Sequence, residues 1–276
     1  MHKEVRRARA IASFAERYEK FEFLPSMKRV SCLLGSRREF ITTTAIADAW
    51  LEDPLFSLAS ACWYGYARQG APPRYWRLAA QAVGKAANQV GQYDSSFPTQ
   101  VWNNFVDLCQ HPENCIELDD RNLNPVKPNW KLPTVRDLAS LHLRHRNLMR
   151  YMCENIVENA AVCHSSISSR VKGMSEKTTA FLLRDVAWVY GLDGKGSLGD
   201  TEEAVYIQPV DVWVGRVSEC LWPDLEGKDW RLVAKKIIEE SRRAAISPIH
   251  FNQGAWYLGA REVKDMTQLC PKLMIL

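Results

Sequence analysis

The segment VKGMSEKTTAFLLRDVAWVY, at residues 171–190, constrains the fold of this chain more than any other. Gly173 allows the left-handed backbone that a short turn between helices needs, and Ser175 can accept a hydrogen bond from an amide as a helix N-cap. The run FLLRDVAWVY that follows has the apolar spacing of a helix with one buried face. The segment therefore predicts a turn that opens a helix over 176–190, with Lys177 in its first turn.

Lys177 is a candidate nucleophile because of that position. The positive end of the helix dipole disfavours a second positive charge, and partial burial of the side chain acts in the same direction, so both favour a neutral amine. A neutral amine can attack an electrophilic carbon, whereas a solvated ammonium is a poor nucleophile. A lysine at a helix start is far more often a solvated charge than a nucleophile, so this residue alone does not indicate chemistry.

A second helix start carries an aspartate. Asp211 follows Pro209 and Val210 and precedes VWVGRVSECLW, so its side chain is expected to cap a helix over 211–222. From that position it can point into a cleft that the two helix starts share. The combination with Lys177 is what indicates an active site.

Together the two segments resemble the helix-hairpin-helix superfamily of DNA glycosylases. The turn of that superfamily reads roughly G-x-G-x-K-T-A, and its catalytic aspartate lies in a P-V-D-x-x-V-x-R segment. The matching positions in this chain are Gly173, Lys177, Thr178, Ala180, Pro209, Val210, Asp211, Val214 and Arg216. By this resemblance, a lysine in the turn marks members that both remove a base and cut the DNA backbone. Ser175 replaces the second glycine, and the separation of the lysine from the aspartate is longer than in many members.

The longer separation narrows the resemblance to the archaeal GO glycosylase branch, which removes 8-oxoguanine. The stretch RQGAPPRYWRLAAQAV at 68–83 is similar to the T-G-x-G-x-x-x-W stretch of that branch. The stretch ISPIHFNQGAWYLGAREV at 246–263 is similar to its I-P-P-x-H-x-(D)-x-x-x-W-L-A-G-R-x-V stretch. The resemblance covers roughly residues 55–263 and implies that Trp76 and Trp256 sandwich the flipped base.

Base recognition also needs a polar group, because 8-oxoguanine carries a hydrogen on N7 where guanine has an acceptor, and stacking cannot sense this. Asn252, one helical turn before Trp256, is the nearest candidate in the sequence, although the archaeal relatives carry aspartate here. The resemblance also places Gly173 and Ser175 near the DNA backbone. Arg216 is expected either to contact a phosphate or to hold the helices together.

The resemblance implies a bifunctional DNA glycosylase and apurinic or apyrimidinic site (AP) lyase. Lys177 would attack C1′ of a flipped nucleotide, expel the base and form an imine that permits β-elimination, while Asp211 stabilises positive charge on the sugar. One alternative is an oxidised-pyrimidine glycosylase and lyase resembling endonuclease III, against which the long loop at 192–206 counts. A second is a non-catalytic helix-hairpin-helix DNA-binding module, although both candidate catalytic residues are present.

The chain is expected to be all-α. Helical patterns cover the ranges 54–68, 74–90, 98–110, 134–159, 176–190, 211–222, 228–244 and 248–262. The segment 111–133 is rich in Pro, Asn and Asp and lacks periodicity, so it is predicted to be a loop.

The resemblance implies two helical lobes with the active cleft between them. We expect residues 1–56 with 218–276 to form one lobe and residues 57–217 to form the other, which carries the hairpin and both catalytic residues.

Charge is distributed unevenly, although the formal net charge is only +4. Residues 1–40 hold ten Lys and Arg against five acids, and residues 127–150 hold six against one. Both stretches are candidate phosphate contacts with damaged DNA, or solvated basic faces. No hydrophobic leader and no membrane-spanning stretch is evident, so we expect a soluble intracellular monomer, in the cytoplasm or nucleoid of a prokaryote or in a eukaryotic nucleus.

The eight cysteines are scattered, which favours free thiols over a disulfide framework. Only Cys270 lies where iron–sulfur members of the superfamily place four closely spaced cysteines, so such a cluster is not expected. The partial sets Cys109, His111 and Cys115, or His142 and His145, offer too few ligands for zinc. We therefore expect no metal and no cofactor.

Overall fold

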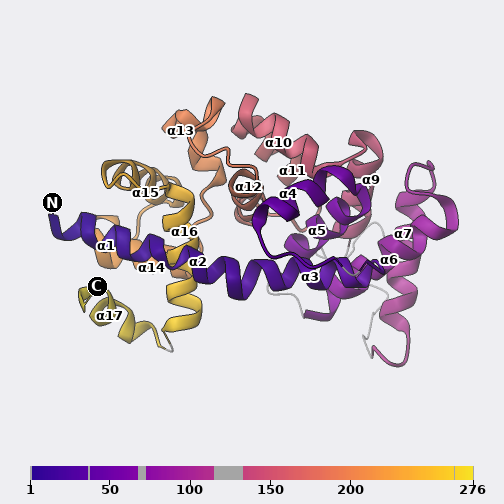
Figure 1. Ribbon diagram of the computed structural model, residues 1–276, viewed down its shortest axis with the longest axis horizontal. Coiled ribbons are helices and arrows are strands. Elements are labelled where there is room, and N and C mark those ends of the chain that lie inside the picture. Colours follow the sequence, from indigo (N-terminus) through magenta and orange to yellow (C-terminus); the bar gives the residue numbers. More distant parts are fainter. Residues whose placement is uncertain (1, 37, 68–72, 115–132, 264, 276) are drawn as a thin grey trace.

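The computed structural model describes residues 2–36, 38–67, 73–114, 133–263 and 265–275, and over these residues the chain is all-α, as predicted (Figure 1). The α-helices are α1 (His2–Ser13), α2 (Ala15–Tyr18), α3 (Leu24–Leu33), α4 (Thr43–Glu52), α5 (Pro54–Ala67), α6 (Pro73–Val90), α7 (Phe97–Gln110), α9 (Thr134–His145), α10 (Leu148–Glu158), α11 (Ala160–Arg170), α12 (Glu176–Val189), α13 (Thr201–Ala204), α14 (Val212–Leu221), α15 (Trp230–Arg243), α16 (Pro248–Tyr257) and α17 (Leu269–Ile275). Two π-helical segments, Glu19–Phe23 and Leu258–Glu262, continue α2 and α16.

The predicted helices agree with this structure except for the one expected over 134–159, which is wrong. Helix α9 ends before Arg146, whose φ of +66° lies outside the helical region. Asn147 then starts α10, because its Oδ1 accepts a hydrogen bond from the amide of Arg150 at 3.1 Å. The predicted loop at 111–133 lies almost entirely outside the described residues.

The N-terminal part of the chain forms a nearly continuous helical rod along the long axis of the molecule (Figure 1). The buried hydrophobic residues of this rod follow a helical stripe and are Ala8, Ile11, Ala15, Tyr18, Phe23, Met27 and Val30. Successive members lie three or four residues apart, except for the step of five between Tyr18 and Phe23. The π-helical segment Glu19–Phe23 covers this step, so the widened turn keeps the stripe facing the core.

Within the described ranges, buried apolar side chains form two clusters. The larger cluster extends from Tyr18 to Ile207 along the chain and also takes in a few residues of α15 and α16. The smaller one joins α1 to residues 214–273. Buried residues within 18–56 thus pack in the larger cluster, although these positions are expected in the terminal lobe; the two-lobe division itself stays a prediction.

Helices α1 and α16 approach each other very closely. Gly254 of α16 faces the backbone of α1, and a Cβ atom at this position would collide with the carbonyl oxygen of Ile11. Only glycine allows this contact. It fixes α16, and with it Asn252, against the N-terminal rod.

Candidate active site

A tight turn over 171–175 joins α11 to α12 and places Lys177. Gly173 has a φ of +88°, and the Oγ of Ser175 accepts a hydrogen bond from the amide of Thr178 at 3.3 Å. The left-handed glycine and the serine cap predicted from the sequence are therefore confirmed.

Hydrogen bonds from two side chains of helix α9 hold this turn in place. The backbone amide of Lys172 donates to Oδ2 of Asp137 at 3.0 Å, and the carbonyl of Lys172 accepts from Oγ1 of Thr134 at 2.7 Å. Thr134 is fully buried. Helices α11 and α12, which the turn connects, and helix α9, which binds it, thus fix its position.

Lys177 lies in the first turn of α12, as predicted, but its side chain is exposed. The partial burial expected from the sequence is therefore not observed. The neighbouring Glu176 forms an ion pair with Arg231 of α15, with 3.7 Å between Oε1 and Nη2. The amine of Lys177 is open to solvent.

Asp211 caps α14, which also confirms the sequence prediction. Its Oδ1 accepts hydrogen bonds from the amides of Trp213 at 3.0 Å and Val214 at 2.9 Å. Both capping bonds use the same carboxylate oxygen, so Oδ2 takes no part in the cap. The residue is half-buried.

A cavity of about 400 Å³ lies between the start of α12, the segment that leads into α14, and the start of α15. Its lining residues are Ser175, Glu176, Lys177, Ala180, Gln208, Pro209, Val210 and Trp230. The cavity brings Lys177 together with Pro209 and Val210, the two residues that directly precede Asp211. The start of α12 and the segment that leads to α14 therefore border one space, and Asp211 itself is not part of the lining.

Besides Glu176, the lining contains Gln208 and Trp230, which no sequence motif indicates. Trp230 is the first residue of α15 and is half-buried, and the guanidinium carbon of Arg231 lies 5.1 Å from the centre of a ring of Trp230. In the sequence, Trp230 stands at the start of an apolar stripe that continues with Val233 and Ile237, a pattern typical of core packing. Gln208 lies directly before Pro209 and carries no motif that could have found it.

The two tryptophans expected to sandwich a base are not brought together. Trp76 is 5% exposed and packs in the larger hydrophobic cluster from α6. Trp256 lies on α16, where its ring meets Tyr18 edge-on with centroids 5.7 Å apart. Helices α6 and α16 lie well apart along the long axis of the molecule (Figure 1).

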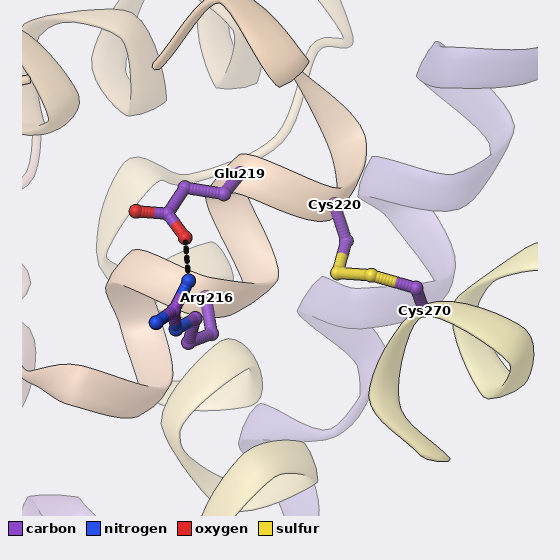
Figure 2. The surroundings of a disulfide bond; sticks show 4 residues. All are labelled: Arg216, Glu219, Cys220 and Cys270. Carbon is purple, nitrogen blue, oxygen red and sulfur yellow. Dashed lines mark hydrogen bonds and ion pairs between the residues drawn. A yellow bond between two sulfur atoms is a disulfide. The ribbon is translucent and has the colours of Figure 1, made fainter. Parts of the chain in front are cut away.

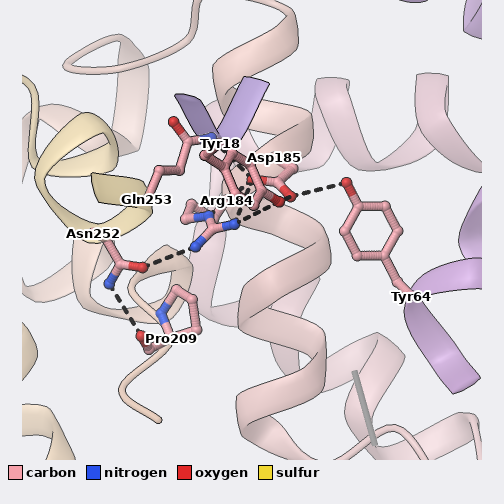
Figure 3. A network of polar contacts seen from close by, with 7 residues as sticks. All are labelled: Tyr18, Tyr64, Arg184, Asp185, Pro209, Asn252 and Gln253. Carbon is pink, nitrogen blue, oxygen red and sulfur yellow. Dashed lines mark hydrogen bonds and ion pairs between the residues drawn. The ribbon is translucent and has the colours of Figure 1, made fainter. Parts of the chain in front are cut away.

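Asn252 is fully buried, and its amide is engaged within the protein (Figure 3). Its Oδ1 accepts from Nη1 of Arg184 at 2.9 Å, and its Nδ2 donates to the carbonyl oxygen of Pro209 at 3.0 Å. The residue predicted to read the base instead connects α12 to the segment that leads to Asp211.

Asn252 belongs to a buried polar network centred on Arg184 and Asp185, two adjacent residues of α12 (Figure 3). Burial opposes the charge of Arg184, but Asp185 together with Tyr18 and Tyr64 more than offsets this effect, so the pKa of Arg184 is raised. Asp185 also accepts hydrogen bonds from Oη of Tyr64 at 3.0 Å and from Nε2 of Gln253 at 3.1 Å. The network therefore ties α5, α12 and α16 to the backbone of Pro209.

Arg216 lies on the exposed surface of α14 and pairs with Glu219 at 2.8 Å (Figure 2). It borders a separate groove that also contains Cys220 and Cys270. These two cysteines form a disulfide between α14 and α17, so the prediction of free thiols is wrong for them. They are 50 residues apart in the sequence, and only the packing of α17 on α14 makes them neighbours.

The basic stretch at 1–40 is partly engaged in contacts within the protein. Arg17 pairs with Glu262 at 2.6 Å across the junction of α2 and the end of α16. The first six residues of the other basic stretch, 127–150, lie outside the described residues. A role of either stretch in phosphate contact stays a prediction.

In the described part of the chain, no group of three or more His, Cys, Asp or Glu side chains could hold a metal ion. Cys115 lies outside that part. His142 is buried, and burial, together with the charge of Arg146, lowers its pKa to about 4, so its ring is neutral near neutral pH. His145 is a partly exposed ring stacked on Tyr151 with centroids 3.8 Å apart.

None of the helices among the described residues is long and apolar enough to cross a membrane. Comparison of the chain with protein-family models, curated proteins and solved structures finds no match.

Proposed function

We propose that the chain is a bifunctional DNA glycosylase and AP lyase that excises 8-oxoguanine from damaged DNA as a monomer. The observation that carries the proposal is the cavity that Lys177 shares with Pro209 and Val210, directly before the aspartate that caps α14. A nucleophilic amine and a carboxylate are the two groups that this chemistry needs, and Asp211 directly follows the cavity-lining residue Val210 in the chain, although it is not itself part of the lining. The choice of 8-oxoguanine comes from the sequence resemblance.

The reaction begins with extrusion of the nucleotide from the duplex, because the glycosidic bond cannot be reached within the base stack. The neutral amine of Lys177 forms a bond to C1′, and the bond from C1′ to the base nitrogen breaks with its electron pair leaving on the base, which takes up a proton. Asp211 stabilises the positive charge that develops on the sugar. Bound DNA would cover Lys177, which is exposed in the free protein, and this desolvation favours the neutral amine.

The second step cuts the backbone. Opening of the sugar ring converts the amine adduct to a protonated imine, which acidifies the hydrogens on C2′. Loss of one of these protons and departure of the 3′ phosphate complete β-elimination, and water then releases the lysine. This activity would operate where the DNA of the cell is held, in the cytoplasm or nucleoid of a prokaryote or in a eukaryotic nucleus.

The test uses duplex oligonucleotides that carry 8-oxoguanine, thymine glycol or uracil, with and without borohydride. We expect wild-type protein to be trapped covalently on 8-oxoguanine DNA, and Lys177→Gln to lose trapping, base release and strand scission. Lys195→Gln is the matched control, because Lys195 is also exposed and lies outside the cavity lining. Undiminished trapping of Lys177→Gln would place the nucleophile elsewhere.

Asp211→Asn tests the second group. Asparagine can still cap α14, so folding and DNA binding should persist while the chemical step slows by more than tenfold, about 1.4 kcal/mol. A smaller loss would make Asp211 a helix cap only. Preference for thymine glycol would favour the endonuclease III-like alternative, and binding of lesion DNA without any reaction would favour the non-catalytic module.

A further inference from the structure

The cavity beside Lys177 contains a hydrogen-bonding group that the protein leaves unused. Gln208 borders this cavity and is 1% exposed, and among the described residues its Oε1 has no hydrogen-bond partner. Buried amide oxygens are nearly always satisfied, because an unpaired one loses its hydration without compensation. An N–H donor from a ligand in the cavity would remove this cost.

Gln208 is held at the cavity wall by its neighbours along the chain. The carbonyl of the next residue, Pro209, is fixed by Asn252, whose own amide is fixed by Arg184. The backbone amide of Gln208 donates to the carbonyl of Val205 at 3.1 Å. The backbone of Gln208 is thus anchored at the cavity wall.

Trp230 supplies an aromatic face to the same space. It is half-buried, lies at the start of α15 and lines the cavity together with the apolar side chains of Ala180, Pro209 and Val210. A half-buried indole next to a nucleophile and an unsatisfied amide suits a flat heterocycle with N–H donors, because stacking and hydrogen bonding can act on it together.

We propose that Gln208 and Trp230 are the residues that select the extruded base: Trp230 stacks on its ring, and the side-chain carbonyl of Gln208 accepts from a base N–H. This inference rests on the proposed function. In 8-oxoguanine the N–H at N7 is such a donor, and guanine presents an acceptor at that position, so the same carbonyl would favour the lesion. In this proposal, Gln208 and Trp230 contact the base in place of Asn252, Trp76 and Trp256, the residues expected to do so from the sequence.

An AP site separates base selection from chemistry, because it needs Lys177 but contains no base. We expect Trp230→Ala to slow release of 8-oxoguanine by about tenfold to a hundredfold, the range typical of lost base stacking. Gln208→Leu should slow it by about tenfold. Both variants should keep wild-type borohydride trapping on an oligonucleotide with a preformed AP site. Trp230→Phe retains a stacking ring and should stay near the wild-type rate of base release.

The matched controls are Trp102→Ala and Gln110→Leu, which lie on α7 and outside the cavity lining. Gln208→Leu should not lower the midpoint of thermal unfolding, since it removes an unsatisfied buried oxygen. Release of 8-oxoguanine at the wild-type rate by both cavity variants would overturn the inference, and so would an equal loss of base release and AP-site trapping. If wild-type protein itself is not trapped on the AP site, the proposed function fails instead.

Discussion

Asn252→Ala is expected to destabilise the protein strongly, whereas a base-contacting residue on the surface of a cleft would tolerate this change. The side chain is fully buried and makes two hydrogen bonds, one to the charged guanidinium of Arg184 and one to the carbonyl of Pro209. Hydrogen bonds to charged groups contribute about 1.5–3 kcal/mol, and a buried group left unpaired costs about 1–3 kcal/mol. The free energy of unfolding should therefore fall by about 3–5 kcal/mol, which lowers the midpoint by roughly 10 °C.

Urea unfolding followed by circular dichroism measures this loss. Asn103→Ala is the matched control, because Asn103 lies in the middle of α7 with an exposed side chain, and its change should stay within about 0.5 kcal/mol. A loss below about 1 kcal/mol in Asn252→Ala would refute the structural role. If such a variant also confused 8-oxoguanine with guanine, Asn252 would read the base as its sequence position predicts.

Two further predictions concern stability. Gly254→Ala should lower the free energy of unfolding by several kcal/mol or prevent folding, because its Cβ would collide with the backbone of Ile11. Gly215→Ala is the control and should be neutral or stabilising, because its Cβ would meet only an ordinary side-chain contact at 3.8 Å. Thermal unfolding of the two variants measures the difference. Burial lowers the pKa of His142 from 6.5 to about 4, so the unfolded chain takes up a proton before the folded protein does. The contribution of His142 to stability should be constant above pH 6.5, fall by about 3 kcal/mol as the pH drops to 4, and level off below it, so the difference in the free energy of unfolding between wild type and His142→Phe, measured in urea, should change by this amount across the window. A difference that is independent of pH would contradict the assignment.

The local chemistry of the two helix starts could be read from the sequence. Gly173, Ser175 and Asp211 act on backbone groups within three residues of themselves, so their residue types suffice to predict a turn and two caps. Helix ranges were similarly accessible, because periodicity reports a buried face. The N-terminal rod escaped prediction because the five-residue step from Tyr18 to Phe23 interrupts the period.

The side chains that complete the site could not be predicted in this way, because their roles depend on distant partners. From the sequence alone, Asn252 is a candidate base-contacting residue. The structure shows that it instead binds Arg184, which lies on another helix. Trp230 belongs to a core stripe in the sequence, and only the placement of α15 beside the start of α12 turns it toward the cavity. The sequence motif thus locates Lys177 at the start of α12, and tertiary packing decides which residues surround it.

The bond between Cys220 and Cys270 closes a covalent ring that contains the whole of α15 and α16. Lys228 lies in an exposed turn within this ring. After a single tryptic cut at Lys228, the disulfide would still hold the two pieces together, so a non-reducing gel would show one band at the position of the intact chain. A thiol reductant would separate this band into two fragments. Limited digestion with and without reductant thus maps the connection between these helices directly, and it reports in any preparation what fraction of the chains carries the cross-link.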